Sequence, residues 1–123
     1  MVDLKILGRA TLVGIVLQAV LAVVIHFAGW IPLFGQLFAT MMISATAGYL
    51  YAMDLGKGYF NGMTGGALAG GLCGGAGILA TLALGDVPGF AIPIGAAVAV
   101  LTGTVGGLFG QMAAVMRSLE RRR

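Results

Sequence analysis

The chain has 123 residues, of which 59% are hydrophobic and only 9% charged, and its mean hydropathy is +1.03. Soluble domains carry about 25% charged residues, so this composition excludes an ordinary soluble globular protein. A membrane-spanning helix takes about 20 apolar residues, and the chain has room for four such helices. We therefore expect a small polytopic membrane protein.

The first pair of predicted spans lies between Arg9 and Asp54, a stretch of 44 residues without a formal charge. One helix of that length would extend about 66 Å, roughly twice the hydrocarbon thickness of a bilayer. The chain must therefore turn back, and 29–32 (Gly-Trp-Ile-Pro) is suited to the turn because proline does not continue a helix. This predicts spans at 10–28 and 33–53. A cleaved signal peptide is the alternative for 10–28, although its apolar run is long for one.

The second pair of spans follows from two further charge-free stretches, 28 residues between Lys57 and Asp86 and 30 residues between Asp86 and Arg117. Each stretch fits one helix, which predicts spans at 62–84 and 89–114, followed by a basic tail at 115–123. The expected fold class is an all-α membrane protein, a four-transmembrane-helix bundle that forms a single integral membrane domain over 1–123.

The basic residues predict the orientation of this bundle. With four spans, all seven fall on one side of the membrane, and the two loops on the opposite side carry none. The positive-inside rule then places both termini and the 54–61 loop in the cytoplasm. The membrane would be the plasma membrane of a cell or a bacterial inner membrane. The tail would also attract anionic lipid headgroups by about 1 kcal/mol per basic residue. A net charge of +3 does not predict nucleic-acid binding. The seven residues are Lys5, Arg9, Lys57, Arg117, Arg121, Arg122 and Arg123.

A short motif recurs in the two outer loops. Residues 29–34 and 85–90 both match the pattern G-x-[IV]-P-x-F at an offset of 56 residues. Two tandem parallel helical hairpins would produce this match, with the copies related by an axis along the membrane normal. Turns between membrane helices favour glycine and proline in any case, so convergent turn chemistry is the favoured explanation of the match and duplication the alternative.

Glycine is concentrated in the second half of the chain, where 15 of the 22 glycines lie between positions 62 and 110. Residues four apart share a helix face, and small residues there let helix backbones approach closely in lipid. These faces predict packing within one protomer, in a homo-oligomer or in a larger membrane complex, and the three are compatible. The predicted packing residues are Gly62, Gly66, Gly70, Gly74, Gly103, Gly106, Gly107 and Gly110.

A few polar side chains interrupt the apolar spans. Each is explained either by interhelical hydrogen bonding and interfacial anchoring or by a polar path for a solute. Asp54 and Lys57 fit a solvated turn with a weak ion pair, or else a gate or docking site. Aromatic belts at the two interfaces are expected from the residues around this loop and from Trp30 on the opposite side. The residues around the loop are Tyr49, Tyr51, Tyr59 and Phe60. The intramembrane candidates are Gln18, His26, Thr40, Ser44 and Thr102.

No combination of residues with a catalytic pattern is present: the sequence has one histidine, one cysteine and no paired carboxylates within a span. We expect no enzyme activity, cofactor or metal site. The leading expectation is a non-catalytic accessory, assembly or scaffolding subunit that associates through glycine-rich helix packing. The alternative is a homo-oligomeric channel or small-solute transporter that uses the intramembrane polar residues.

Overall fold

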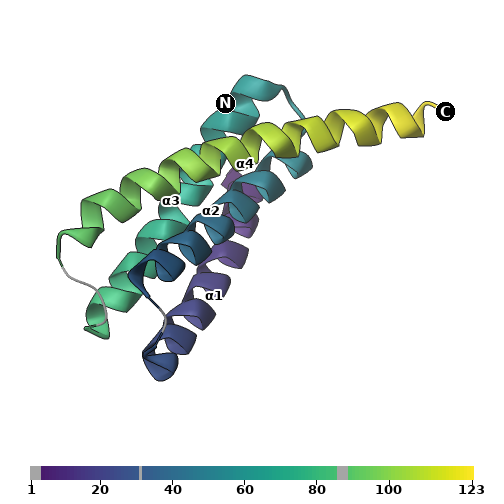
Figure 1. The fold of residues 1–123 in the computed structure, drawn as a ribbon. Helices are drawn as coiled ribbons and strands as arrows, with labels where there is room; N and C mark the ends of the chain where they lie inside the picture. Colours follow the sequence, from purple (N-terminus) through teal and green to yellow (C-terminus); the bar gives the residue numbers. More distant parts are fainter. Residues whose placement is uncertain (1–3, 31, 86–88) are drawn as a thin grey trace.

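The computed structural model describes residues 4–30, 32–85 and 89–123. Four helices account for nearly all of this part of the chain, and it contains no strand: α1 (Leu4–Ala28), α2 (Leu33–Leu55), α3 (Tyr59–Ala83) and α4 (Ala91–Arg121). Successive helices run in opposite directions, so the two termini lie toward the same end of the bundle (Figure 1). The all-helical prediction is confirmed.

The helices extend beyond the predicted spans at the ends that carry the basic residues. α1 begins at Leu4 rather than at 10, and α4 continues to Arg121 rather than stopping near 114. Most of the predicted tail at 115–123 is therefore helical. The sequence explains this, because residues 111–121 contain neither glycine nor proline and are rich in good helix formers such as methionine, arginine and leucine. At these ends, α1 and α4 therefore continue past the limits of the predicted spans.

The helices are not packed equally. α2, α3 and α4 contact one another, whereas α1 contacts α2 and α3 and, in the described part of the chain, has no contact with α4. In Figure 1, α4 (green to yellow) crosses the near side of the bundle and α1 (purple to blue) lies on the far side. α1 presents one narrow buried stripe to its neighbours, made of Ala10, Gly14, Gln18, Ala22 and Ile25.

This arrangement bears on the two predicted hairpins. A two-fold axis relating α1–α2 to α3–α4 would bring α1 against α4 as α2 lies against α3, and the described residues show no such contact. Gly29 and Gly85, which open the two motif copies, do have the same backbone conformation, with φ of +57° and +76° just beyond a helix end. Ile31 and residues 86–88 of the motifs lie outside the described residues. A duplication therefore stays a prediction.

The turn between α2 and α3 is only three residues long. Gly56 ends α2 in the left-handed region, with φ of +60°, and its N–H donates a hydrogen bond to the carbonyl of Ala52. Gly58, with φ of +105°, precedes α3. Glycine is suited to both positions because a side chain disfavours positive φ. The tight turn brings the end of α2 and the start of α3 together under the extended part of α4 (Figure 1).

Three of the helices are long and apolar enough to cross a membrane, judged on the described residues: Leu4–Ala28 in α1, Tyr59–Ala80 in α3 and Ile92–Arg121 in α4. Their outward surfaces are rich in exposed aliphatic side chains such as Leu12, Val16, Val20 and Leu101. These features indicate a membrane protein.

Candidate functional site

The glycines of α3 and α4 form a close helix contact within the chain. A methyl group added at Gly70 would lie 2.6 Å from the α-carbon of Gly103, and one added at Gly66 would lie 2.9 Å from the α-carbon of Gly107. A methyl group on Gly107 would overlap the carbonyl oxygen of Gly62. Real side-chain carbons do not approach backbone atoms this closely, so the two helices meet backbone to backbone along this seam.

A second face of α4 packs in the same way against α2. Methyl groups added at Gly106 and Gly110 would overlap the carbonyl oxygens of Ala45 and Tyr49, respectively. Gly74 of α3 lies against Ala99 of α4. All eight glycines predicted to pack are thus buried against other helices of the same chain.

The buried centre of the bundle holds a serine and the single cysteine. Ser44 and Cys73 are both completely buried, and the Cys73 Sγ atom lies 3.9 Å from the Ser44 Oγ and 3.4 Å from the carbonyl oxygen of Gly70. Gly14 of α1 makes room for the cysteine, because a methyl group there would lie 2.7 Å from the Cys73 Cβ. Sequence reasoning did not select Cys73 or Gly14, although Gly14 lies four residues from Ala10 on one face of α1.

Gln18 occupies a separate buried position, between α1 and α3. Only 2% of its surface is exposed, and its Nε2 atom is buried without a hydrogen-bond partner in the described part of the protein. Gly77 provides the space for this side chain, because a methyl group at Gly77 would lie 2.5 Å from the Gln18 Oε1. The carboxamide is therefore enclosed by helix packing.

The other intramembrane candidates lie in different environments. The Thr102 hydroxyl donates to carbonyl oxygens of its own helix, 2.8 Å to Val98 and 3.2 Å to Ala99. Thr40 is half-buried, whereas His26 is exposed near the end of α1 with its ring edge-on to Phe27. The Ser44 hydroxyl lies 3.9 Å from the Cys73 Sγ atom. The structure does not bring the five candidates together into one polar surface.

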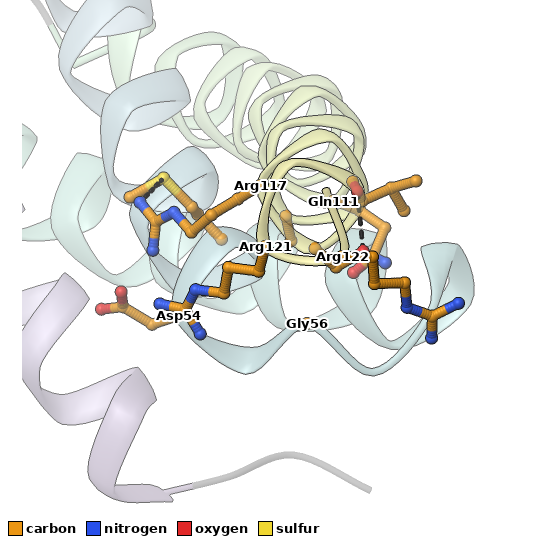
Figure 2. A pocket seen from close by; sticks show the side chains of 10 residues that line it. Asp54, Gly56, Gln111, Arg117, Arg121 and Arg122 are labelled. Atoms are coloured by element: carbon orange, nitrogen blue, oxygen red, sulfur yellow. Dashed lines mark hydrogen bonds between the residues drawn. The ribbon is translucent and has the colours of Figure 1, made fainter.

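A polar pocket lies where the extended part of α4 passes over the α2–α3 turn (Figure 2). Its volume is about 560 Å³, and it is open to the surface. Asp54 lines it, but Lys57, the other loop candidate, does not. The polar residues and turn glycine that form it are Asp54, Gly56, Gln111, Arg117, Ser118, Arg121 and Arg122.

The arginines of this pocket come from the last turns of α4. Arg117 donates a hydrogen bond from Nη2 to the Met53 Sδ at 3.2 Å. In Figure 2 Arg117 and Arg121 extend to the side of the pocket that holds Asp54, and Arg122 extends to the opposite side. The side chains of Arg121 and Arg122 form no hydrogen bond or ion pair with the described part of the chain.

Gln111 forms the inner end of the pocket. Only 5% of its surface is exposed, yet its Oε1 atom is buried without a hydrogen-bond partner among the described residues. The pocket therefore combines a positively charged rim with an unused buried acceptor. Sequence reasoning treated the arginines as a tail, because it did not extend α4 over the turn.

Comparisons with protein-family models, with curated proteins and with solved structures find no match to this chain. In the residues that the structure describes, no three His, Cys, Asp or Glu side chains gather in a group that could hold a metal ion. The packing of the helices and the pocket are therefore the features of this chain that bear on function.

Proposed function

We propose that the protein is a four-span integral membrane protein that acts as a non-catalytic accessory or assembly subunit. Three helices have the length and composition of spans. The fourth, α2, has 23 residues, enough for about 35 Å at 1.5 Å per residue, and its first charged residue is Asp54. α2 also contacts all three other helices. A helix that shares contacts with three spanning neighbours is best accommodated by crossing with them.

The proposed orientation places both termini and the α2–α3 turn in the cytoplasm. The membrane would be the plasma membrane of a cell or a bacterial inner membrane. Its support is the position of the seven basic residues, all of which belong to the ends of the chain or to that turn. Cytoplasmic loops carry an excess of lysine and arginine. The exposed arginines of α4 would then meet anionic lipid headgroups at the inner leaflet.

The observation that favours an accessory role over a channel is the packing of the polar residues. Gln18 and Ser44 are enclosed between helices, and the Thr102 hydroxyl is occupied by backbone carbonyls. A channel needs hydrogen-bonding groups that line a continuous path for its solute. Because these side chains lie apart and are largely buried, they support helix packing better than permeation.

The glycine contacts change where a partner would bind. Because the seams of α3 and α4 are filled by the chain itself, the proposed homo-oligomer or larger membrane complex would form through outward-facing side chains. A subunit of this kind has a stable internal bundle and a lipid-facing exterior that other helices replace on assembly. Its contribution is structural.

The test is purification from the native membrane in a mild detergent, followed by mass spectrometry of the co-purified chains and flux measurements in liposomes. The proposal expects a stoichiometric partner and liposomes that stay tight to ions and small solutes. A purified homo-oligomer that conducts, with flux altered in Gln18→Leu, would establish the alternative of a channel or solute transporter. Gly75→Leu is the matched control, because Gly75 has no other atom within 4 Å of an added methyl group.

A further inference from the structure

The pocket under α4 has features of a binding site that helix packing does not require. Its 560 Å³ volume falls in the usual range for small-molecule sites, about 300–1,000 Å³. Three arginines and one aspartate line it, so its charge is positive. Arginine presents a planar set of donors that matches phosphate oxygens, and Arg121 and Arg122 are not engaged by the described part of the chain.

The inner end of the pocket points to a second property of the ligand. The Gln111 Oε1 atom needs a hydrogen-bond donor, because a buried acceptor without a partner is costly. A bare phosphate group offers acceptors only. Asp54 adds a carboxylate, which also accepts hydrogen bonds and would repel a phosphate placed against it. The ligand should therefore carry hydroxyl groups as well as an anionic phosphate.

We propose that this pocket binds a phosphodiester headgroup that bears free hydroxyls, of the kind found in phosphatidylglycerol. The phosphate lies against Arg122, on the side of the pocket away from Asp54, and the headgroup hydroxyls donate to Gln111 Oε1 and the Asp54 carboxylate. A headgroup with net negative charge suits three arginines and one aspartate better than a zwitterionic one. The pocket thereby selects a lipid by its headgroup, beyond the general attraction of basic residues to an anionic surface.

The position of the pocket supports a lipid as the source of this chemistry. It is lined by the end of α2, by Gly56 of the α2–α3 turn and by the C-terminal part of α4 (Figure 2). This step rests on the proposed four-span arrangement, which places these helix ends at the cytoplasmic headgroup layer. Basic pockets between membrane helices on that side bind lipid headgroups.

The test measures lipid binding to the full-length protein in mild detergent, by melting temperature and by native mass spectrometry. Phosphatidylglycerol is compared with phosphatidylethanol, which has the same phosphodiester charge but no free hydroxyl, and with zwitterionic phosphatidylethanolamine. We expect phosphatidylglycerol to raise the melting temperature most. Equal binding of phosphatidylglycerol and phosphatidylethanol would overturn the hydroxyl contact, and preference for phosphatidylethanolamine would overturn the proposal. Soluble glycerol phosphate forms a further arm: a matching rise with it would assign the site to a free phosphate.

Variants separate this pocket from general electrostatics. Arg122→Gln should weaken phosphatidylglycerol binding by about tenfold or more, because it removes a hydrogen bond between charged groups in addition to the general attraction of a basic residue to an anionic surface. Arg123→Gln is the matched control, because Arg123 carries the same charge but does not line the pocket. An equal loss in the control would overturn the proposal.

Gln111→Met supplies the test of the inner contact. It keeps the approximate shape of the side chain and removes the acceptor, so it should abolish the preference for phosphatidylglycerol over phosphatidylethanol. An unchanged preference would overturn the role of Gln111. Since Gln111 is buried, Arg122→Gln, at an exposed position, keeps the proposal testable if this variant does not fold. None of these measurements needs a partner subunit or a flux, so failure of the accessory role would leave them interpretable.

Discussion

Gly65 of α3 lies directly against the phenol ring of Tyr51 of α2, with no space between them for even a methyl group. The tyrosine is completely buried, so its ring fills the volume that a side chain on α3 would otherwise occupy. This pair joins the two helices near the α2–α3 turn. It corrects the expectation that Tyr51 belongs to an interfacial aromatic belt: the ring enters the core because glycine leaves room for it.

Gly65→Ala should destabilise the protein. The added methyl group overlaps the Tyr51 ring, and inserting atoms into a packed core costs about 1–3 kcal/mol. The measurement is the free energy of unfolding in mild detergent, with the loss of helix content as the signal. Gly75→Ala on the same helix is the control, since a methyl group there meets nothing within 4 Å and alanine favours helix over glycine. Equal stability of the two variants would contradict the packing described for Tyr51.

Gly70→Leu tests whether the glycine seam joins helices of one chain. The larger side chain cannot fit against Gly103, so α3 and α4 should separate. The free energy of unfolding of the monomer should fall by at least about 1–3 kcal/mol. Unfolding in detergent and the mass of the protein by light scattering are measured together. Gly75→Leu should change neither. A Gly70→Leu variant that keeps its stability but changes its oligomeric mass would place the seam between chains instead.

The sequence predicted which helix faces pack, but it did not predict which helix covers each face. The spacing of Gly62, Gly66 and Gly70 places them on one helix face, because helical periodicity is a local property. Which helix covers that face depends on how all four helices fit together, so packing within a chain and between chains could not be separated. The pocket depends on a further non-local fact, the passage of α4 over the α2–α3 turn, which brings Gln111 and Asp54 into one cavity.

Gln18→Met should maintain or increase stability. The Gln18 Nε2 atom is buried without a partner in the described structure, so removing the carboxamide removes an unsatisfied group while methionine keeps the shape of the side chain. We expect an unfolding free energy equal to that of the parent or higher by about 1 kcal/mol. Unfolding in detergent measures it, with Ala22→Gly on the same buried stripe as a destabilising reference. A clear loss of stability in Gln18→Met would show that the carboxamide holds the helices together.

Cysteine labelling tests the orientation. Cys73 is completely buried, so the parent protein should not react with a membrane-impermeant maleimide until it is unfolded. Trp30→Cys, in the exposed loop between α1 and α2, should react in intact cells, because that loop carries no basic residue and is expected outside. Ser118→Cys, exposed on the arginine-bearing part of α4, is the matched position on the other side and should react only after permeabilisation.

The reverse pattern would invert the proposed orientation and move the pocket to the outer leaflet. Equal labelling of both positions in intact cells would indicate two orientations, contrary to the one-sided placement of the basic residues.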